Sequence, residues 1–182
     1  VTPSSKVVGD LALHLAAVDA DPTDFEENPG SYDIPDSVVG FLAGELGEIR
    51  GYRGIHCEDY MADAQGPFTF RHDPAGGGAL ADIGSHALAT AEFLCGPVTR
   101  VMGDCVTMIG RRPDGKGGSR EVVTDDVGRA FLRFENGATG SIEGNWIATG
   151  RKMQHDFEVY GTKGALAFSQ EHFNVLHFFS TA

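Results

Sequence analysis

The sequence predicts an α+β fold, an open and mostly antiparallel β-sheet with helices packed on one face. In the second half of the chain, short apolar strands alternate with tight turn signals. The clearest signal is Asn136-Gly137, because this pair supplies the positive φ angles of a two-residue hairpin turn. A helix pattern precedes these strands and stops at Gly96-Pro97. Successive hairpins build an antiparallel sheet, and the helix can cover one of its faces.

The helix pattern follows three consecutive glycines, Gly76 to Gly78, which let the backbone bend with positive φ close to another surface. Asp82 and His86 stand four residues apart, so a helix places the carboxylate and the imidazole one turn apart on one face. A carboxylate that orients an imidazole prepares a general acid or base, which makes this pair the candidate catalytic site. The pattern alone also allows Asp82 to stabilise the helix start and His86 to be a core histidine.

Strand patterns lie on both sides of the helix. One strand is expected from Ile49 to Cys57, and others over residues 98–109, 127–134, 138–147, 153–160 and 165–169. A glycine-rich charged hairpin loop is expected over residues 111–120. The strands offer enough apolar positions for a second buried face, although the sequence leaves open which face each occupies; these positions are Phe131, Ile142, Phe157 and Val159.

The chain divides into an acidic N-terminal segment, residues 1–37, whose structure the sequence leaves open, and an α/β domain, residues 38–182. An apolar stripe in the segment fits a short helix, and acidic residues interspersed with prolines then indicate an irregular connection. Asp10 and His14 repeat the four-residue spacing. No glycine bend leads into them, so we treat this pair as a coincidence.

Charge and cysteine content narrow the class of protein. The formal net charge of −12, without a basic stripe, argues against nucleic acid and anionic membranes as partners. The cysteines Cys57, Cys95 and Cys105 are too few and too widely spaced for a disulfide framework or a zinc site, so no metal is expected. Without a membrane-spanning stretch or a signal-peptide layout, we expect a cytoplasmic protein.

A family resemblance is carried by the runs Arg71 to Pro74 and Gly76 to His86, which are similar to the signature of the second domain of Gfo/Idh/MocA oxidoreductases. Asp125-Asp126 with its later Glu-Asn-Gly turn, and the run Phe157 to Gly164, also resemble the family. These are NAD- or NADP-dependent sugar and cyclitol dehydrogenases with a glyceraldehyde-3-phosphate-dehydrogenase-like C-terminal domain. The resemblance implies that Asp82 and His86 meet the substrate carbinol, and that the open sheet face joins subunits into a homo-oligomer.

The resemblance also implies further site residues. Phe70-Arg71 stands where the family has a Trp-Arg pair near the nicotinamide, although Phe70 lacks an indole N–H donor. Arg71 could bind cofactor or substrate through its fork of donors, or form a surface ion pair with Asp73. Trp146 could stack on the apolar face of a sugar and Arg151 could reach a substrate oxygen, whereas packing and solubility are the alternatives for both.

The family's nucleotide-binding half has no counterpart in this sequence. A G-x-G-x-x-G turn after a strand is absent, as is the Glu-Lys-Pro motif whose lysine assists proton transfer. Two hypotheses follow. The chain is the substrate-binding and oligomerisation half of an NAD- or NADP-dependent oxidoreductase acting on a sugar, cyclitol or polyol, completed by a Rossmann domain. Alternatively, it is a stand-alone binding or assembly module, which the acidic opening favours.

Overall fold

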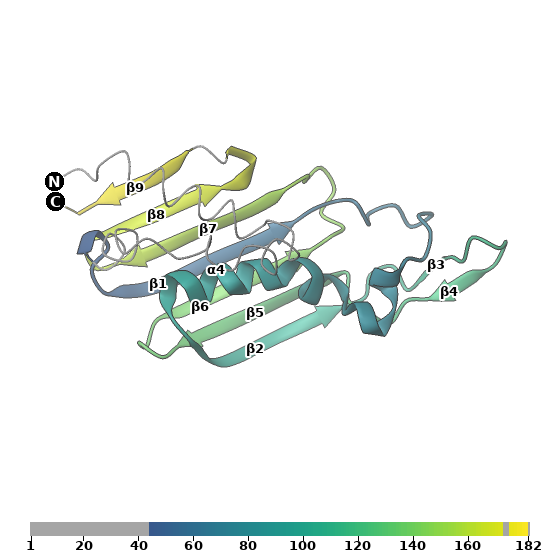
Figure 1. Ribbon diagram of the computed structural model, residues 1–182, viewed down its shortest axis with the longest axis horizontal. Coiled ribbons are helices and arrows are strands. Elements are labelled where there is room, and N and C mark those ends of the chain that lie inside the picture. The colour runs from purple at the N-terminus through teal and green to yellow at the C-terminus, as the bar shows by residue number, and fades with distance from the viewer. Residues whose placement is uncertain (1–43, 173–174, 182) are drawn as a thin grey trace, which may run out of the picture.

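A seven-stranded sheet forms the body of the protein (Figure 1). The computed structural model describes residues 44–172 and 175–181, so the acidic segment expected over residues 1–37 lies outside the described part. The strands of the sheet are β1 (Ile49–Cys57), β2 (Val98–Val106), β5 (Val127–Phe134), β6 (Thr139–Asn145), β7 (Gln154–Gly161), β8 (Gly164–Ser169) and β9 (Leu176–Ser180). Their order across the sheet is β2-β5-β6-β1-β7-β8-β9. Two short strands, β3 (Arg111–Pro113) and β4 (Ser119–Glu121), form a separate ribbon within the expected charged hairpin.

Neighbouring strands of the large sheet are antiparallel, except that β1 and β6 run parallel. The predicted fold class is therefore confirmed. The one parallel pair arises because β1, the strand before the helix, is inserted between β6 and β7 of the later hairpins. The alternation of apolar residues predicted the other strands of this sheet, but it did not predict that β1 lies between β6 and β7. The strand β9 was not predicted.

The predicted helix is present as α4 (Ser85–Cys95), preceded by a π-helical turn, η3 (Leu80–Gly84). Figure 1 shows α4 lying across one face of the sheet. Ala87 and Ala91 are completely buried, and small side chains there let the helix lie close to the strands. The Tyr52 hydroxyl on β1 donates a hydrogen bond to the Ala87 carbonyl at 3.2 Å. Gly96 ends the helix with a φ of 86°, as its sequence position predicted.

The helix decides which strand residues are buried. Ile142, Phe157 and Val159 lie under α4 in the main hydrophobic core, together with Tyr52. Phe131, in contrast, points to the opposite face and is 65% exposed. The apolar positions named from the sequence are thus divided between the two faces, and only Phe131 contributes to the open one.

Glycines at two close contacts determine how the chain enters the helix. Gly78 has a φ of 77°, and a Cβ there would lie 2.3 Å from the Asp125 carboxylate. Asp125 holds the start of η3, because its carboxylate accepts the Leu80 N–H at 2.8 Å and its carbonyl accepts the Ala79 N–H at 2.9 Å. On β6, a Cβ at Gly144 would lie 2.8 Å from the Gly84 Cα. The π turn therefore lies directly on the sheet backbone.

A buried carboxylate, Asp126, joins the end of the sheet to the β3–β4 ribbon. Its Oδ1 accepts the Trp146 indole N–H at 2.8 Å, and its Oδ2 accepts two backbone N–H groups of the loop after β2. Arg112, 1% exposed, lies 4.0 Å from Asp126 and donates to the carbonyls of Met61 and Asp63. One charge thus organises three segments.

Replacing Asp126 with Asn should destabilise the fold by about 3 kcal/mol, because it leaves the Arg112 charge buried without its counter-charge. The Asn amide would also direct N–H groups at other donors. Urea unfolding measures the loss. Glu121→Gln, which removes an exposed carboxylate from β4, is the control and should stay within about 0.5 kcal/mol of wild type. Equal effects of the two substitutions would contradict the role given to Asp126.

Candidate active site beside the helix start

A hollow of about 380 Å³ opens where the end of β1 meets the start of α4. Four segments line it: β1 and the loop after it, the 3₁₀ turn Phe70–His72, the first turns of the helical run, and the loop before β7. The lining residues are His56, Glu58, Tyr60, Arg71, Asp82, Ile83, His86 and Met153. The structure therefore places Arg71, Asp82 and His86 around one hollow.

Asp82 is held by two donors that come from earlier in the chain. Its Oδ2 accepts hydrogen bonds from the Tyr60 hydroxyl at 2.9 Å and from the Arg71 Nε at 2.8 Å. Arg71 therefore pairs with Asp82 and not with Asp73, which lies 3.8 Å from Arg120. Burial, together with the Asp82 charge, raises the pKa of Tyr60, so this hydroxyl stays protonated and donates. The carboxylate has a fixed orientation at the wall of the hollow.

His86 is half-buried and belongs to a group of three imidazoles. Its ring centroid lies 5.3 Å from that of His56, whose ring stacks on His155 at 5.1 Å with an interplanar angle of 1°. The His56 Nε2 lies 3.2 Å from a Glu58 carboxylate oxygen, and the His155 Nε2 lies 3.3 Å from the Thr90 hydroxyl. The His86 ring thus has a rigid polar support. The expectation that Asp82 sets its tautomer stays a prediction.

Trp146 lies behind the hollow. Its side chain is completely buried, its indole N–H is bound to Asp126, and its ring contacts Tyr60 and His72. A ring without exposed surface cannot stack on a sugar, so the expected binding role is corrected to one of support. Its burial depends on the distant Asp126, which local sequence does not show.

Phe70 and Arg151 lie outside the lining of the hollow. The Phe70 ring is 69% exposed and lies 4.7 Å from the Arg71 guanidinium, so it offers a flat apolar surface beside the site. Arg151 is exposed in the loop after β6, where its guanidinium lies 3.4 Å from Glu171. The ion pair with Glu171 supports the alternative of a solvated surface residue for Arg151.

The sequence allowed His56, Glu58 and Tyr60 to meet a ligand but favoured solvated loop residues, and Met153 was not predicted; all four line the hollow. His56 lies near the end of β1, and Glu58 and Tyr60 continue its alternation beyond the last strand residue, so all three face the same hollow. That alternation was visible in the sequence. The direction in which it points, however, depends on where the helix lies, and the loop residues alone fitted solvent equally well.

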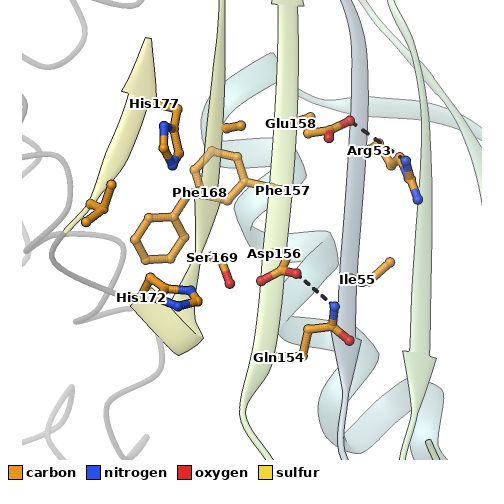
Figure 2. Close-up of a pocket in the computed structure, with 12 residues that line it drawn as sticks. Arg53, Ile55, Gln154, Asp156, Phe157, Glu158, Phe168, Ser169, His172 and His177 are labelled. Atoms are coloured by element: carbon orange, nitrogen blue, oxygen red, sulfur yellow. Dashed lines mark hydrogen bonds and ion pairs between the residues drawn. The ribbon is translucent and has the colours of Figure 1, made fainter. Parts of the chain in front are cut away.

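A second hollow, of about 520 Å³, lies on the open face of the sheet (Figure 2). Arg53 and Glu158 face each other there across β1 and β7 at 3.9 Å, and the Gln154 amide donates to Asp156 at 2.9 Å. It contains none of the predicted site residues. The candidate site is therefore the smaller hollow, where a carboxylate, a guanidinium and an imidazole lie together.

Residues 41–167 match the family model described as the GFO/IDH/MocA C-terminal domain. The chain belongs to this family. Levoglucosan dehydrogenase of Pseudarthrobacter phenanthrenivorans is 34% identical over 143 residues, covering 70% of this chain and 37% of that protein. A putative UDP-kanosamine synthase oxidoreductase subunit of Amycolatopsis mediterranei is 35% identical over 134 residues, covering 68% of this chain and 37% of that protein. The chain thus spans little more than a third of these relatives.

Solved structures of the family share the fold. An NAD-binding oxidoreductase from Klebsiella pneumoniae superposes with a TM-score of 0.75 at 34% identity, covering 78% of this chain and 38% of the other. Levoglucosan dehydrogenase in complex with NADH and levoglucosan gives a TM-score of 0.73 at 35% identity, covering 79% of this chain and 39% of the other. This chain is therefore similar to one part of each enzyme.

The N-terminal stretch has different relatives. Residues 1–71 match a second family model, described as a conserved carboxylase domain. Pyruvate carboxylase of Bacillus subtilis is 39% identical over 71 residues, covering 39% of this chain and 6% of that enzyme. Pyruvate carboxylase of Staphylococcus aureus is 48% identical over 53 residues, covering 29% of this chain and 5% of that enzyme. The opening that does not resemble Gfo/Idh/MocA proteins is thus similar to another family.

His72, behind the site, should remain neutral at pH values where a free imidazole is protonated. Burial, and then the Arg112 charge, lower its pKa, and its Nδ1 accepts the Thr69 N–H at 2.9 Å. The unfolded chain therefore takes up this proton more readily, and the stability that neutral His72 contributes declines as the pH falls below about 6.5. A histidine-ring NMR titration, assigned with His72→Gln, measures the pKa. A value at or above 6.5 would contradict this assignment.

Proposed function

We propose that this chain is the substrate-binding half of an NAD- or NADP-dependent oxidoreductase that acts on a CH–OH group of a sugar, cyclitol or related polyol. The observation that carries the proposal is the hollow in which His86 lies beside Asp82, itself held by Tyr60 and Arg71. Family membership and the similarity to levoglucosan dehydrogenase support it. A cytoplasmic location, which we also propose, fits three free cysteines in a reducing compartment.

The residues of the hollow suit oxidation of an alcohol. In our proposal His86 accepts the hydroxyl proton while the carbon-bound hydrogen leaves as hydride, so the alcohol becomes a carbonyl. Asp82 stabilises the resulting imidazolium by its charge. The Arg71 Nε is bound to Asp82, and its terminal N–H groups would hold a substrate oxygen.

In the same proposal, the nicotinamide of the cofactor would lie beside this hollow. The exposed ring of Phe70 and the partly exposed side chains of Tyr60 and Met153 give its surroundings a flat, largely apolar surface. The cofactor would supply the hydride acceptor. The choice between NAD and NADP depends on the ribose-binding residues of a nucleotide-binding half.

The open sheet face is the surface that we propose for contact between subunits, as the family resemblance implies. Phe131 and Tyr160 are exposed large side chains on this face, and the hollow of Figure 2 makes part of the face concave. Charged pairs such as Arg53 and Glu158 would set the orientation of the partner.

A stand-alone binding or assembly module is the second candidate. The observation in its favour is that residues 1–71 are similar to a conserved carboxylase domain. In this case the hollow would bind a polyol without oxidising it. The two candidates are separated by fusing this domain to a nucleotide-binding half and measuring whether the fusion protein oxidises a polyol.

Titration of this chain with NADH should give no saturable change in cofactor fluorescence. A dinucleotide needs a G-x-G-x-x-G turn between a strand and a helix to hold its pyrophosphate, and the sequence contains no such turn. Intact levoglucosan dehydrogenase, whose structure with NADH is known, is the positive control. Saturable binding to this chain alone would show that the cofactor is held mainly by the present domain.

His86→Asn should lower turnover by about 10² to 10⁴-fold and leave stability nearly unchanged, since it removes a general base from a half-buried position. Turnover can be measured by fusing residues 44–182 to the nucleotide-binding half of the Pseudarthrobacter enzyme and following NADH formation with levoglucosan and inositol. His172→Asn, exposed on the 3₁₀ turn after β8, is the matched control. Wild-type turnover of the His86 variant would remove His86 from the mechanism.

A further inference from the structure

Among the residues that the structure describes, the strand β2 forms an edge of the sheet and pairs only with β5 (Figure 1). Every residue of β2 after Val98 is exposed, including Val101 at 63% and Met102 at 69%. A strand of this length with one free side presents a row of backbone donors and acceptors. Natural proteins usually protect such edges against pairing with another chain, for example with a β-bulge or a covering segment. In β2, the register shift between Val98 and Arg100 disturbs the strand only at its first residues.

Backbone alternation identifies the groups that face outward. The Val106 carbonyl accepts the Asp126 N–H at 2.9 Å on the inner side of β2. In an antiparallel ladder, alternate residues direct both of their backbone groups to the same neighbour. Arg100, Met102 and Asp104 therefore bond to β5, while the backbone groups of Val101 and Gly103 point away from the sheet.

We propose that β2 joins two copies of this chain edge to edge, antiparallel, about a two-fold axis through Met102. This axis places Val101 opposite Gly103 of the second copy, so their outward groups exchange hydrogen bonds. It also places Arg100 opposite Asp104 of the second copy, twice by symmetry. The strand is complementary in charge to itself, which a second copy satisfies and an arbitrary peptide does not.

Side chains on β5 extend this complementarity. Met102 lies opposite Phe131, so the axis creates a continuous apolar row of two Met102 and two Phe131 side chains on the open face. Arg100 lies opposite Arg133 in the register of β2 and β5, so two like charges are paired across these strands. Asp104 of the second copy gives Arg100 an opposite charge.

Edge pairing differs from packing of the open faces, because it continues one sheet through both subunits. The inference therefore does not depend on the dehydrogenase proposal or on the face contact proposed above. Both contacts can exist in one assembly, and different residues report on each.

Charge reversal tests the pairing. Arg100→Asp alone, or Asp104→Arg alone, places like charges opposite each other twice and should raise the dimer dissociation constant at least about tenfold in sedimentation velocity. An equimolar mixture of the two variants should recover a heterodimer, because each Asp then faces an Arg. A wild-type chain that stays monomeric up to its solubility limit would overturn the proposal, as would variants that associate like wild type.

A disulfide tests the register. With Cys105→Ser as background, Met102→Cys should form a cross-linked dimer on mild oxidation, because paired Cα atoms lie about 4.5 Å apart. Phe131→Cys is the matched control on the same face. Three strand spacings, about 14 Å, would separate it from its copy, so edge pairing predicts no cross-link there. Cross-linking through position 131 and not through position 102 would indicate face packing and overturn the edge pairing.

Discussion

The fold of this domain depends on two adjacent carboxylates, Asp125 and Asp126, which lie directly before β5 and point in opposite directions. Asp125 points to the helix side and holds the first residues of the π turn. Asp126 points inward, where it binds the Trp146 indole and the loop after β2 and lies near Arg112. Because the two side chains point in opposite directions, one short segment holds both the π turn and the support behind it. The buried charge is tolerated because donors surround it.

The site could be predicted where local sequence determines it. The glycine bend, the helix end at Gly96 and the shared face of Asp82 and His86 follow from backbone preference and helical period. The donors that hold Asp82 could not be found this way. Arg71 and Tyr60 lie 11 and 22 residues earlier in the chain, and only the folded loop brings them to the carboxylate. Trp146 was misplaced for the same reason, since its burial depends on Asp126.

In the sheet, too, some features follow from local sequence and others from contacts between distant segments. Strand positions and the Asn-Gly turn were readable, because side-chain alternation and turn chemistry are local properties. The burial of Ile142 and the exposure of Phe131 were not, because each depends on where α4 lies. The central place of β1 also depends on long-range pairing. Residues 41–71 match both family models, yet β1 pairs with β6 and β7 of the dehydrogenase-type domain and contributes Tyr52 to its core.

The π turn before α4 makes the geometry of the site depend on the length of the chain as well as on its composition. A π turn contains about one residue more than an α turn, and each helical residue advances the chain by about 100°. Deleting Ile83 would regularise the helix and leave Asp82 and His86 three residues apart, with their side chains separated by about 60° around the helix axis. Both side chains of the pair would be retained, but they would no longer meet at the hollow in the same arrangement. Insertions and deletions in this turn should therefore alter the geometry of the pair even where neither residue is substituted.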